Sequence, residues 1–365
     1  MTEHEAYIAF SVFPGIGPMR FRLLLDYFGS AKKAWEASSS SLDKINLGGK
    51  LIQKFVDFRK THDVDSYNKQ LAHQHVNTLP YGDARYPKLL GEISDPPIVL
   101  YVKSKPGMPK IDMERTIAVV GTRKATPYGM EVTRRITSEL VQEGCTIVSG
   151  MAYGIDAVAH ETAMALGGKT IAVLGCGVDI IAPPCNARIY RKLTEDGHGA
   201  VVSEMPLGLR PGKGLFPARN RIISGLSLGV LVTEGADDSG ALITARYAGE
   251  QGRDVFAIPG NITSPYSKGP TLLLKNGAIL VESARDILDA LKITGKPKKS
   301  PSNRIPELTT MEEKRIIASL SMGKKHVDEI VKEVKCSPSL VFSTLTVLEM
   351  KGIIRDVGEK VYEML

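Results

Sequence analysis

The sequence predicts an α/β protein built around a doubly wound, mostly parallel sheet, with a small helical domain before it and a small domain after it. Two observations carry this prediction: short apolar runs follow one another after Thr116, and stretches with helical spacing fill the gaps. The runs are apolar throughout instead of alternating, which is typical of strands covered on both faces. They span residues 116–121, 145–150, 169–175, 200–204, 229–235, 254–260 and 278–281. We therefore expect a Rossmann-like domain over residues 111–290.

The first part of the chain, residues 1–65, predicts short helices. Two helical stretches each contain a glycine turn, at residues 15–17 and 48–49. Such units resemble SAM-like or helix–hairpin–helix modules, whose turns can present backbone N–H groups to a phosphate. A helical packing domain is at least as good an interpretation. Residues 66–110 are rich in proline and predict an extended connector with a first strand at 98–102.

The last part of the chain predicts a basic flexible linker, residues 291–308, and a winged helix, residues 309–365. Thr310 and Glu313 have the spacing of a capping box, which begins the first of three helices. A hairpin around Gly358 follows the third helix. Three helices and a hairpin are the elements of a winged helix.

The third helix of this domain would read DNA in many winged helices. Here Lys351 is its only cation before Gly352, and acidic residues crowd the second helix. Such a surface is too acidic and too apolar for a DNA groove. We therefore expect the winged helix to bind a protein partner.

The composition permits a nucleic-acid partner without requiring one. The chain has 365 residues, which is too long for one ordinary domain, and is 43% hydrophobic and 24% charged, as in soluble globular proteins. Its 47 Lys and Arg against 40 Asp and Glu give a formal net charge of +7. This modest excess suits phosphate.

Cysteine use and the absence of long apolar runs indicate a cytoplasmic protein. The four cysteines form no CxxC pair, which favours reduced thiols over a disulfide framework or a zinc site. The sequence begins without the features of a signal peptide, and no run is long enough to span a membrane. No metal or cofactor is expected.

Ligands of open α/β sheets bind beyond the carboxyl ends of the strands. The residues predicted there are rich in Gly, Ser and Thr, and they include residues 121–124, 149–152 and 239–244. Small residues allow close approach of a phosphate, and arginines supply charge. The stretch after the first strand is neither a GxGxxG motif nor a P-loop.

The most informative stretch is FPARNRIISGLS, residues 216–227. Pro217 and Ala218 predict a helix start, so that residues 219–221, Arg-Asn-Arg, lie near a helix N-terminus that favours anions. Solvated surface arginines are the alternative. Phe216 has the position of a ring that stacks on a base, although core packing explains it equally well.

The acidic and histidine side chains at this edge favour structural roles. Asp156, Asp179, Glu204 and Glu234 could form a hydrolytic set, but caps of helices and pairs with the arginines are the better interpretation. His160 stands alone at helical spacing, as a packed histidine does.

Several ordered motifs resemble the DNA-processing protein A (DprA/Smf) family: VGTR (120–123), SGMAYGIDAVAH (149–160), AVLGCGVD (172–179), FPARNRIISGLS and SGALITARYA (239–248). The resemblance implies a non-enzymatic, cytoplasmic protein of natural transformation. It implies that the protein binds and protects single-stranded DNA, loads the RecA recombinase and forms a homodimer. The DNA-binding residues it implies are Gly121, Thr122, Arg123, Ser149, Gly150, Lys213, Phe216, Arg219, Asn220 and Arg221.

The chain departs from the family pattern at two positions. Ala182 replaces the tyrosine of the usual YPxxN motif, and Thr271 replaces an asparagine of the family pattern. The resemblance therefore does not predict the shape of one local loop or the surface of the dimer. Two other functions stay open. The first is a nucleotide-processing hydrolase similar to phosphoribohydrolases, whose PGGxGTxxE loop is here TEGADDSGALITA. The second is a nucleotide sensor that signals through the winged helix.

Overall fold

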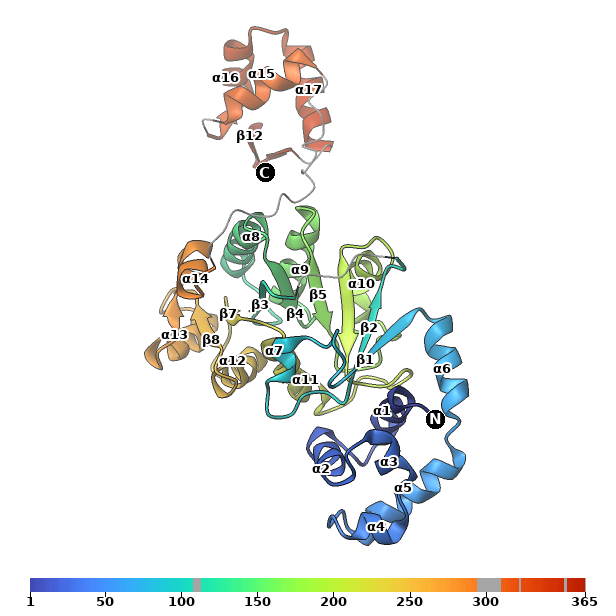
Figure 1. Ribbon diagram of the computed structural model, residues 1–365. Helices are drawn as coiled ribbons and strands as arrows, with labels where there is room; N and C mark the ends of the chain where they lie inside the picture. The colour runs from blue at the N-terminus through green and yellow to red at the C-terminus, as the bar shows by residue number, and fades with distance from the viewer. Residues whose placement is uncertain (108–112, 294–309, 322, 351–352, 365) are drawn as a thin grey trace. The chain divides into compact units, whose positions relative to one another are not determined.

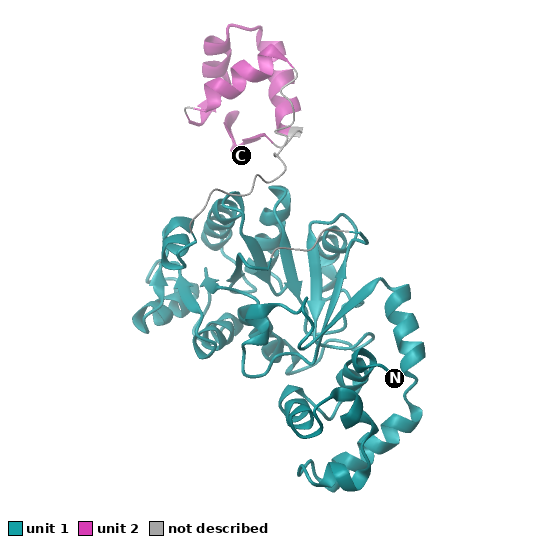
Figure 2. Cartoon of the chain, in the orientation of Figure 1, with its two compact units in different colours: residues 1–300 teal, residues 301–365 magenta. Residues whose placement is uncertain are grey.

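The computed structural model describes residues 1–107, 113–293, 310–321, 323–350 and 353–364. The chain forms two compact units, residues 1–300 and residues 301–365 (Figure 2). The linker predicted over residues 291–308 lies outside the described residues from position 294 onward.

A nine-stranded sheet forms the centre of the first unit, in the order β1-β2-β6-β5-β4-β3-β7-β8-β9 (Figure 1). Its strands are β1 (Val76–Pro80), β2 (Val99–Ser104), β3 (Thr116–Val120), β4 (Thr146–Ser149), β5 (Thr170–Val173), β6 (Gly199–Ser203), β7 (Gly229–Val232), β8 (Asp254–Ala257) and β9 (Ile279–Leu280). Strands β3 to β9 coincide with the predicted runs and pair in parallel, which confirms the mostly parallel sheet. Strand β1 was missed within the expected connector, and it pairs antiparallel with β2.

Helices cover both faces of the sheet, which confirms the doubly wound architecture. They are α7 (Lys88–Gly91), α8 (Pro127–Gln142), α9 (Ile155–Ala165), α10 (Ala187–Thr194), α11 (Leu215–Gly225), α12 (Gly240–Glu250), α13 (Lys268–Lys275) and α14 (Ala284–Ala290), with short 3₁₀ turns at Pro184–Asn186 and Pro265–Ser267. Val120 of β3 shares one core with Ile222 of α11, whereas its neighbour Val119 shares another with Leu140 of α8. Successive strand residues point to opposite faces, so these helices lie on opposite sides.

The strand order reverses beside β3. Strand β4 follows β3 along the chain and lies on one side of it, whereas β7 lies on the other side. The connections leave this point in opposite directions, so the loops after β3 and β7 border a crevice at the carboxyl edge.

The N-terminal helices pack onto the edge of this sheet (Figure 1). They are α1 (Glu3–Val12), α2 (Pro18–Phe28), α3 (Ala31–Glu36), α4 (Ser39–Asp43), α5 (Gly49–Thr61) and α6 (Val64–His73). Phe10 is their centre, with ring centroids 5.1 Å from Phe21 and 5.2 Å from both Trp35 and Phe55. The same core includes Tyr101 of β2, so helices and sheet share one compact unit. The domain boundaries at residues 65 and 110 stay a prediction.

The second unit is a winged helix, as predicted. Its elements are α15 (Met311–Leu320), β10 (Lys325–His326), α16 (Val327–Val334), α17 (Pro338–Met350), β11 (Ile354–Asp356) and β12 (Val361–Met364), and its sheet has the order β10-β12-β11. The capping box of Thr310 and Glu313 begins α15. Ile316, Leu345 and Ile354 are fully buried between the helices and the hairpin. Residues 351–352, with the one predicted cation of the third helix, lie outside the described residues.

Candidate nucleic-acid interface

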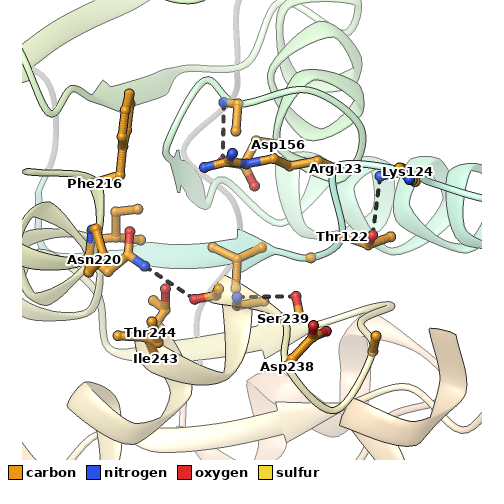
Figure 3. Close-up of a pocket in the computed structure, with 18 of the residues that line it drawn as sticks. Thr122, Arg123, Lys124, Asp156, Phe216, Asn220, Asp238, Ser239, Ile243 and Thr244 are labelled. Atoms are coloured by element: carbon orange, nitrogen blue, oxygen red, sulfur yellow. Dashed lines mark hydrogen bonds between the residues drawn. The ribbon is translucent and has the colours of Figure 1, made fainter. Parts of the chain in front are cut away.

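A cavity of about 500 Å³ opens at the crevice between β3 and β7 (Figure 3). Its lining comes from residues 121–124 after β3, from the first turns of α11, and from residues 236–244 after β7. Segments more than 100 residues apart in the chain therefore meet at the carboxyl edge, where sheets of this topology bind ligands.

A cation and an aromatic ring lie together in this cavity. The guanidinium carbon of Arg123 is 5.8 Å from the ring centroid of Phe216, which is a cation–π distance. Arg123 and its neighbour Lys124 are exposed, and Phe216 is half-buried. Figure 3 shows these three side chains among those that line the cavity. This arrangement presents positive charge and one aromatic face to a ligand, as surfaces that bind single-stranded nucleic acids do.

The turn that carries Arg123 depends on close packing of the backbone at Gly121. A Cβ at residue 121 would lie 2.6 Å from Cγ1 of Ile155 and 2.9 Å from the carbonyl oxygen of Glu234. The next residue, Thr122, donates its backbone N–H to that same carbonyl at 2.7 Å and accepts the N–H of Lys124 at its Oγ1, at 3.1 Å. These contacts hold the two exposed cations at the cavity.

Helix α11 begins earlier than predicted. Its N-cap is Gly214, in the left-handed region at φ +89°, and Leu215 is its first residue. Pro217 is therefore the third helical residue and Arg219 the fifth, so the Arg-Asn-Arg turn lies one turn inside the helix and not at its N-terminus. The expectation that free N–H groups accompany these arginines was wrong for this reason.

Arg219 forms part of the cavity floor and is only 4% exposed. Its Nη1 donates hydrogen bonds to the carbonyl oxygens of Gly150, at 2.7 Å, and of Val173. Burial lowers the pKa of Arg219 to about 10, and the nearby carboxylate of Asp156 opposes that shift. Asp156 is itself buried, which raises its pKa, and its Oδ2 accepts the N–H groups of Gly150 and Ala152 at 3.1 and 3.3 Å. Both residues line the cavity, and their opposite charges favour each other's charged form there.

Arg221 does not line the cavity, which corrects the expectation that it faces a ligand. Its two terminal nitrogens donate to the carboxylate of Glu204 at 2.6 and 2.7 Å, and its Nε lies 2.8 Å from a carboxylate oxygen of Asp95. Burial lowers the pKa of Arg221, but these two carboxylates outweigh burial and raise it. A guanidinium engaged by two carboxylates at 5% exposure has a structural role.

Three other predicted residues lie outside the cavity lining. Ser149 is fully buried and donates its hydroxyl to the carbonyl oxygen of Val119 at 2.7 Å. Gly150 lies against Arg219, whose guanidinium fills the space that a side chain would need. Lys213 is exposed before α11 but does not line the cavity.

Part of the remaining lining comes from five residues that sequence reasoning placed at the edge of the sheet without assigning them to the site. They are Lys124, Ser239, Gly240, Ile243 and Thr244. Asn220, which was assigned, donates its Nδ2 to the carbonyl oxygen of Gly240 at 3.2 Å and so connects α11 to α12 (Figure 3). The SGALIT motif, residues 239–244, was the sequence signal for the part of the lining that comes from the start of α12.

The acidic residues make structural contacts of the kind predicted, and the carboxylate of Asp179 accepts the N–H of Gly208 at 3.0 Å. Asp156 and Glu204 accompany the two buried arginines, and Glu234 accepts the backbone N–H and hydroxyl of Thr126, the N-cap of α8, at 3.0 and 2.6 Å. His160 is confirmed as a packed histidine: it is fully buried, and its Nδ1 lies 2.7 Å from the hydroxyl of Thr170. Burial lowers the pKa of His160 to about 3, so its ring is neutral near pH 7.

The described part of the chain holds neither a metal-ligand cluster nor a membrane-spanning helix. Within residues 1–107, 113–293 and the described winged-helix residues, no three His, Cys, Asp or Glu side chains form a group that could hold a metal ion. No helix among the same residues is long and apolar enough to cross a membrane.

Comparison with known families matches both units. The family model for DNA recombination-mediator protein A matches residues 77–292, and a model for the DprA winged helix domain matches residues 299–359. Protein Smf of Synechocystis is 34% identical over 391 aligned positions that cover 97% of this chain and 96% of the relative. The DNA processing protein DprA of Bacillus subtilis is 43% identical over 60% of this chain and 72% of its own length.

Two solved structures of DNA processing protein A are similar to this chain. The X-ray structure of DprA from Streptococcus pneumoniae superposes with a TM-score of 0.68 at 34% identity, covering 79% of this chain and 98% of that chain. A Helicobacter pylori DNA processing protein A, described for its single-stranded DNA binding mode, superposes with a TM-score of 0.53 at 30% identity, covering 61% of this chain and 98% of that one. The chain therefore belongs to the DNA recombination-mediator protein A (DprA/Smf) family.

Proposed function

We propose that this protein is a non-enzymatic recombination mediator that binds single-stranded DNA in the cavity between β3 and β7. One observation carries the proposal: the exposed guanidinium of Arg123 stands over the ring of Phe216 in a cavity that glycine, serine and threonine residues help to line. Such a site attracts a phosphate and stacks a base without reading sequence. Membership of the family and the DNA-binding mode described for the Helicobacter relative support the same ligand.

A strand with free bases fits this site better than a duplex. Phe216 offers a stacking face inside a concave site, and a base of a duplex is already stacked and paired. We expect binding to depend strongly on salt, since the cations Arg123 and Lys124 meet phosphates, and to depend little on base sequence.

The test is a fluorescence-anisotropy titration of a labelled single-stranded oligonucleotide across a salt series, with the same sequence as a duplex. Tight, salt-sensitive binding that prefers the single strand supports the proposal. Absence of binding at low salt discards the proposal and leaves two alternatives. Release of free base from AMP would then support the nucleotide hydrolase. Mononucleotide binding without affinity for oligonucleotides would support the nucleotide sensor.

The wider role proposed here is protection of incoming single strands and loading of the RecA recombinase in the cytoplasm during natural transformation. Family membership supports it. The test is whether the protein accelerates assembly of RecA on a single-stranded oligonucleotide. An Arg123→Ala variant is the control, since it lacks the proposed DNA contact and leaves the rest of the protein surface unchanged.

A homodimer is proposed as the working form. At the far edge of the sheet, Ile279 and Leu280 of β9 are 36% and 48% exposed, and Leu272 of α13 is 45% exposed. An apolar edge strand is a ready surface for a second chain. Light scattering after gel filtration tests this, and Leu272→Glu is expected to shift the molar mass toward that of the monomer.

We also propose a protein partner for the winged helix. Helix α17 exposes Leu340, Phe342 and Val347, at 42%, 38% and 43%, where a DNA-reading helix would carry cations. Duplex binding by the isolated unit would contradict this part of the proposal.

A further inference from the structure

A second cavity, of about 440 Å³, opens at the same edge of the sheet. Its walls are Thr126 and Tyr128 at the start of α8, Glu234 after β7, and the loop after β8, residues 259–267. None of the DNA-binding residues implied by the family resemblance lies in it.

The two cavities are neighbours along one short segment. Lys124 lines the first cavity and Thr126 the second, and two residues span no more than about 7.6 Å between Cα atoms. Glu234 also joins them, because its backbone carbonyl accepts the N–H of Thr122 and its carboxylate accepts two bonds from Thr126. A chain-like ligand that leaves the first cavity across this segment passes the exposed Lys124 and reaches the second.

Tyr128 gives the second cavity a fixed aromatic surface. Its hydroxyl donates to the carbonyl oxygen of Pro259 at 2.6 Å, and the residue is 44% exposed. The bond to a backbone atom restrains the ring before any ligand arrives, so stacking on it costs little conformational entropy.

Charge decides which part of a nucleotide this cavity accepts. The lining residues include the carboxylate of Glu234, and none of those the structure describes is Lys, Arg or His. An anionic phosphate is disfavoured there, whereas a neutral base is not. The phosphate is better placed beside Lys124.

The loop after β8 offers polar groups for the edge of a base. The Oδ1 of Asn261 accepts the backbone N–H and the hydroxyl of Thr263 at 3.0 and 2.8 Å. No hydrogen bond of the Asn261 Nδ2 is found among the described residues, so this amide can donate to a ligand. The hydroxyl of Ser264 accepts the N–H of Tyr266 at 3.3 Å and keeps its proton for donation.

We propose that the second cavity is a base-binding subsite, in which Tyr128 stacks on one base of the strand whose neighbouring nucleotide occupies the first cavity. Lys124 lies beside the phosphate that connects them. The inference rests on the proposed function, since it extends the same DNA site by one nucleotide.

The test compares Tyr128→Ala, Tyr128→Phe and Tyr27→Ala in anisotropy titrations with a 20-nucleotide oligo-dT. Loss of one stacked base lowers affinity, so Tyr128→Ala is expected to bind about 5- to 100-fold more weakly with an unchanged salt slope. Tyr128→Phe keeps the ring and is expected to bind nearly as wild type does. Tyr27 of α2 is a matched control, because it is 51% exposed and lines neither cavity.

Wild-type affinity in Tyr128→Ala overturns the subsite and leaves the proposed function standing, whereas no binding by the wild-type chain overturns both. A measurement on the unmodified protein guards against misfolding of the variant. Photo-cross-linking with an oligonucleotide that carries 5-iododeoxyuridine should label the peptide containing Tyr128. Cross-links confined to the peptide of Phe216 would refute the subsite.

Discussion

The guanidinium of Arg219 lies against the backbone of Gly150 at the floor of the first cavity. Its Nη1 donates to the Gly150 carbonyl oxygen at 2.7 Å, and a Cβ at residue 150 would lie 2.5 Å from the same nitrogen. The contact ties α11 to the loop after β4, while Asp156 balances the buried charge. Arg219 therefore shapes the cavity, and the exposed Arg123 is the arginine that can meet a phosphate.

Replacing Arg123 by Ala is expected to weaken the binding of single-stranded DNA and to reduce its salt dependence. Removing one cation from a phosphate of a single strand lowers the slope of log K against log salt by about 0.7. Anisotropy titrations at several salt concentrations measure both effects. Arg285→Ala removes the same charge from an exposed position on α14 and should bind as wild type does. An unchanged slope in Arg123→Ala would remove Arg123 from the site.

Replacing Arg219 by Ala is expected to destabilise the fold without changing the salt slope of whatever DNA binding remains. The substitution removes the hydrogen bonds that Arg219 donates to the carbonyl oxygens of Gly150 and Val173, and bonds of charged groups contribute about 1.5–3 kcal/mol each. It also leaves the buried Asp156 without a nearby positive charge. Urea unfolding measures the loss of stability. The double variant Arg219→Met with Asp156→Asn removes both charges and should recover part of it. A slope reduced as much as in Arg123→Ala would show that Arg219 contacts phosphate.

Replacing Gly121 by Ala is expected to lower the free energy of unfolding by about 1–3 kcal/mol, because the new methyl group overpacks the turn. One of its close neighbours would be the backbone carbonyl of Glu234, at 2.9 Å, which cannot swing away as a side chain can. Gly249→Ala is the control, since a Cβ there meets nothing within 4 Å inside α12. Equal stability of the two variants would contradict the packing argument.

His160 is expected to make the protein less stable as the pH falls below about 6.5. Burial lowers its pKa in the folded state from 6.5 to about 3, so between these values the unfolded chain binds a proton that the native chain does not. The stabilising contribution is complete above pH 6.5 and declines by up to about 1.4 kcal/mol per pH unit below it. Urea unfolding at pH 7 and pH 5 measures the decline.

His160→Gln should reduce that pH dependence whatever its effect on absolute stability. His73→Gln, at an exposed position on α6, should leave it unchanged. The same slope in His160→Gln and wild type would assign the pH effect to other groups.

Much of the fold could be predicted because its signals are local. Strands β3 to β9 are continuous apolar runs, and the capping box at Thr310 begins α15 at the expected residue. Strand β1 was missed because its residues, VNTLP, are neither apolar throughout nor regularly alternating, and its pairing with β2 makes it a strand. The start of α11 was misplaced because Gly214 and Leu215 carry no strong N-cap signal.

Periodicity and chain order were enough to predict strands β3 to β9, the winged helix and the gathering of small residues at the strand ends. Which arginine stays free depends on contacts between distant parts of the chain. Arg219 and Arg221 are buried by partners 69 and 126 positions away in the chain, Gly150 and Asp95, and no local pattern reveals such contacts. Arg123 stays exposed because the turn at Gly121 holds it above the cavity, where its charge remains available to a ligand.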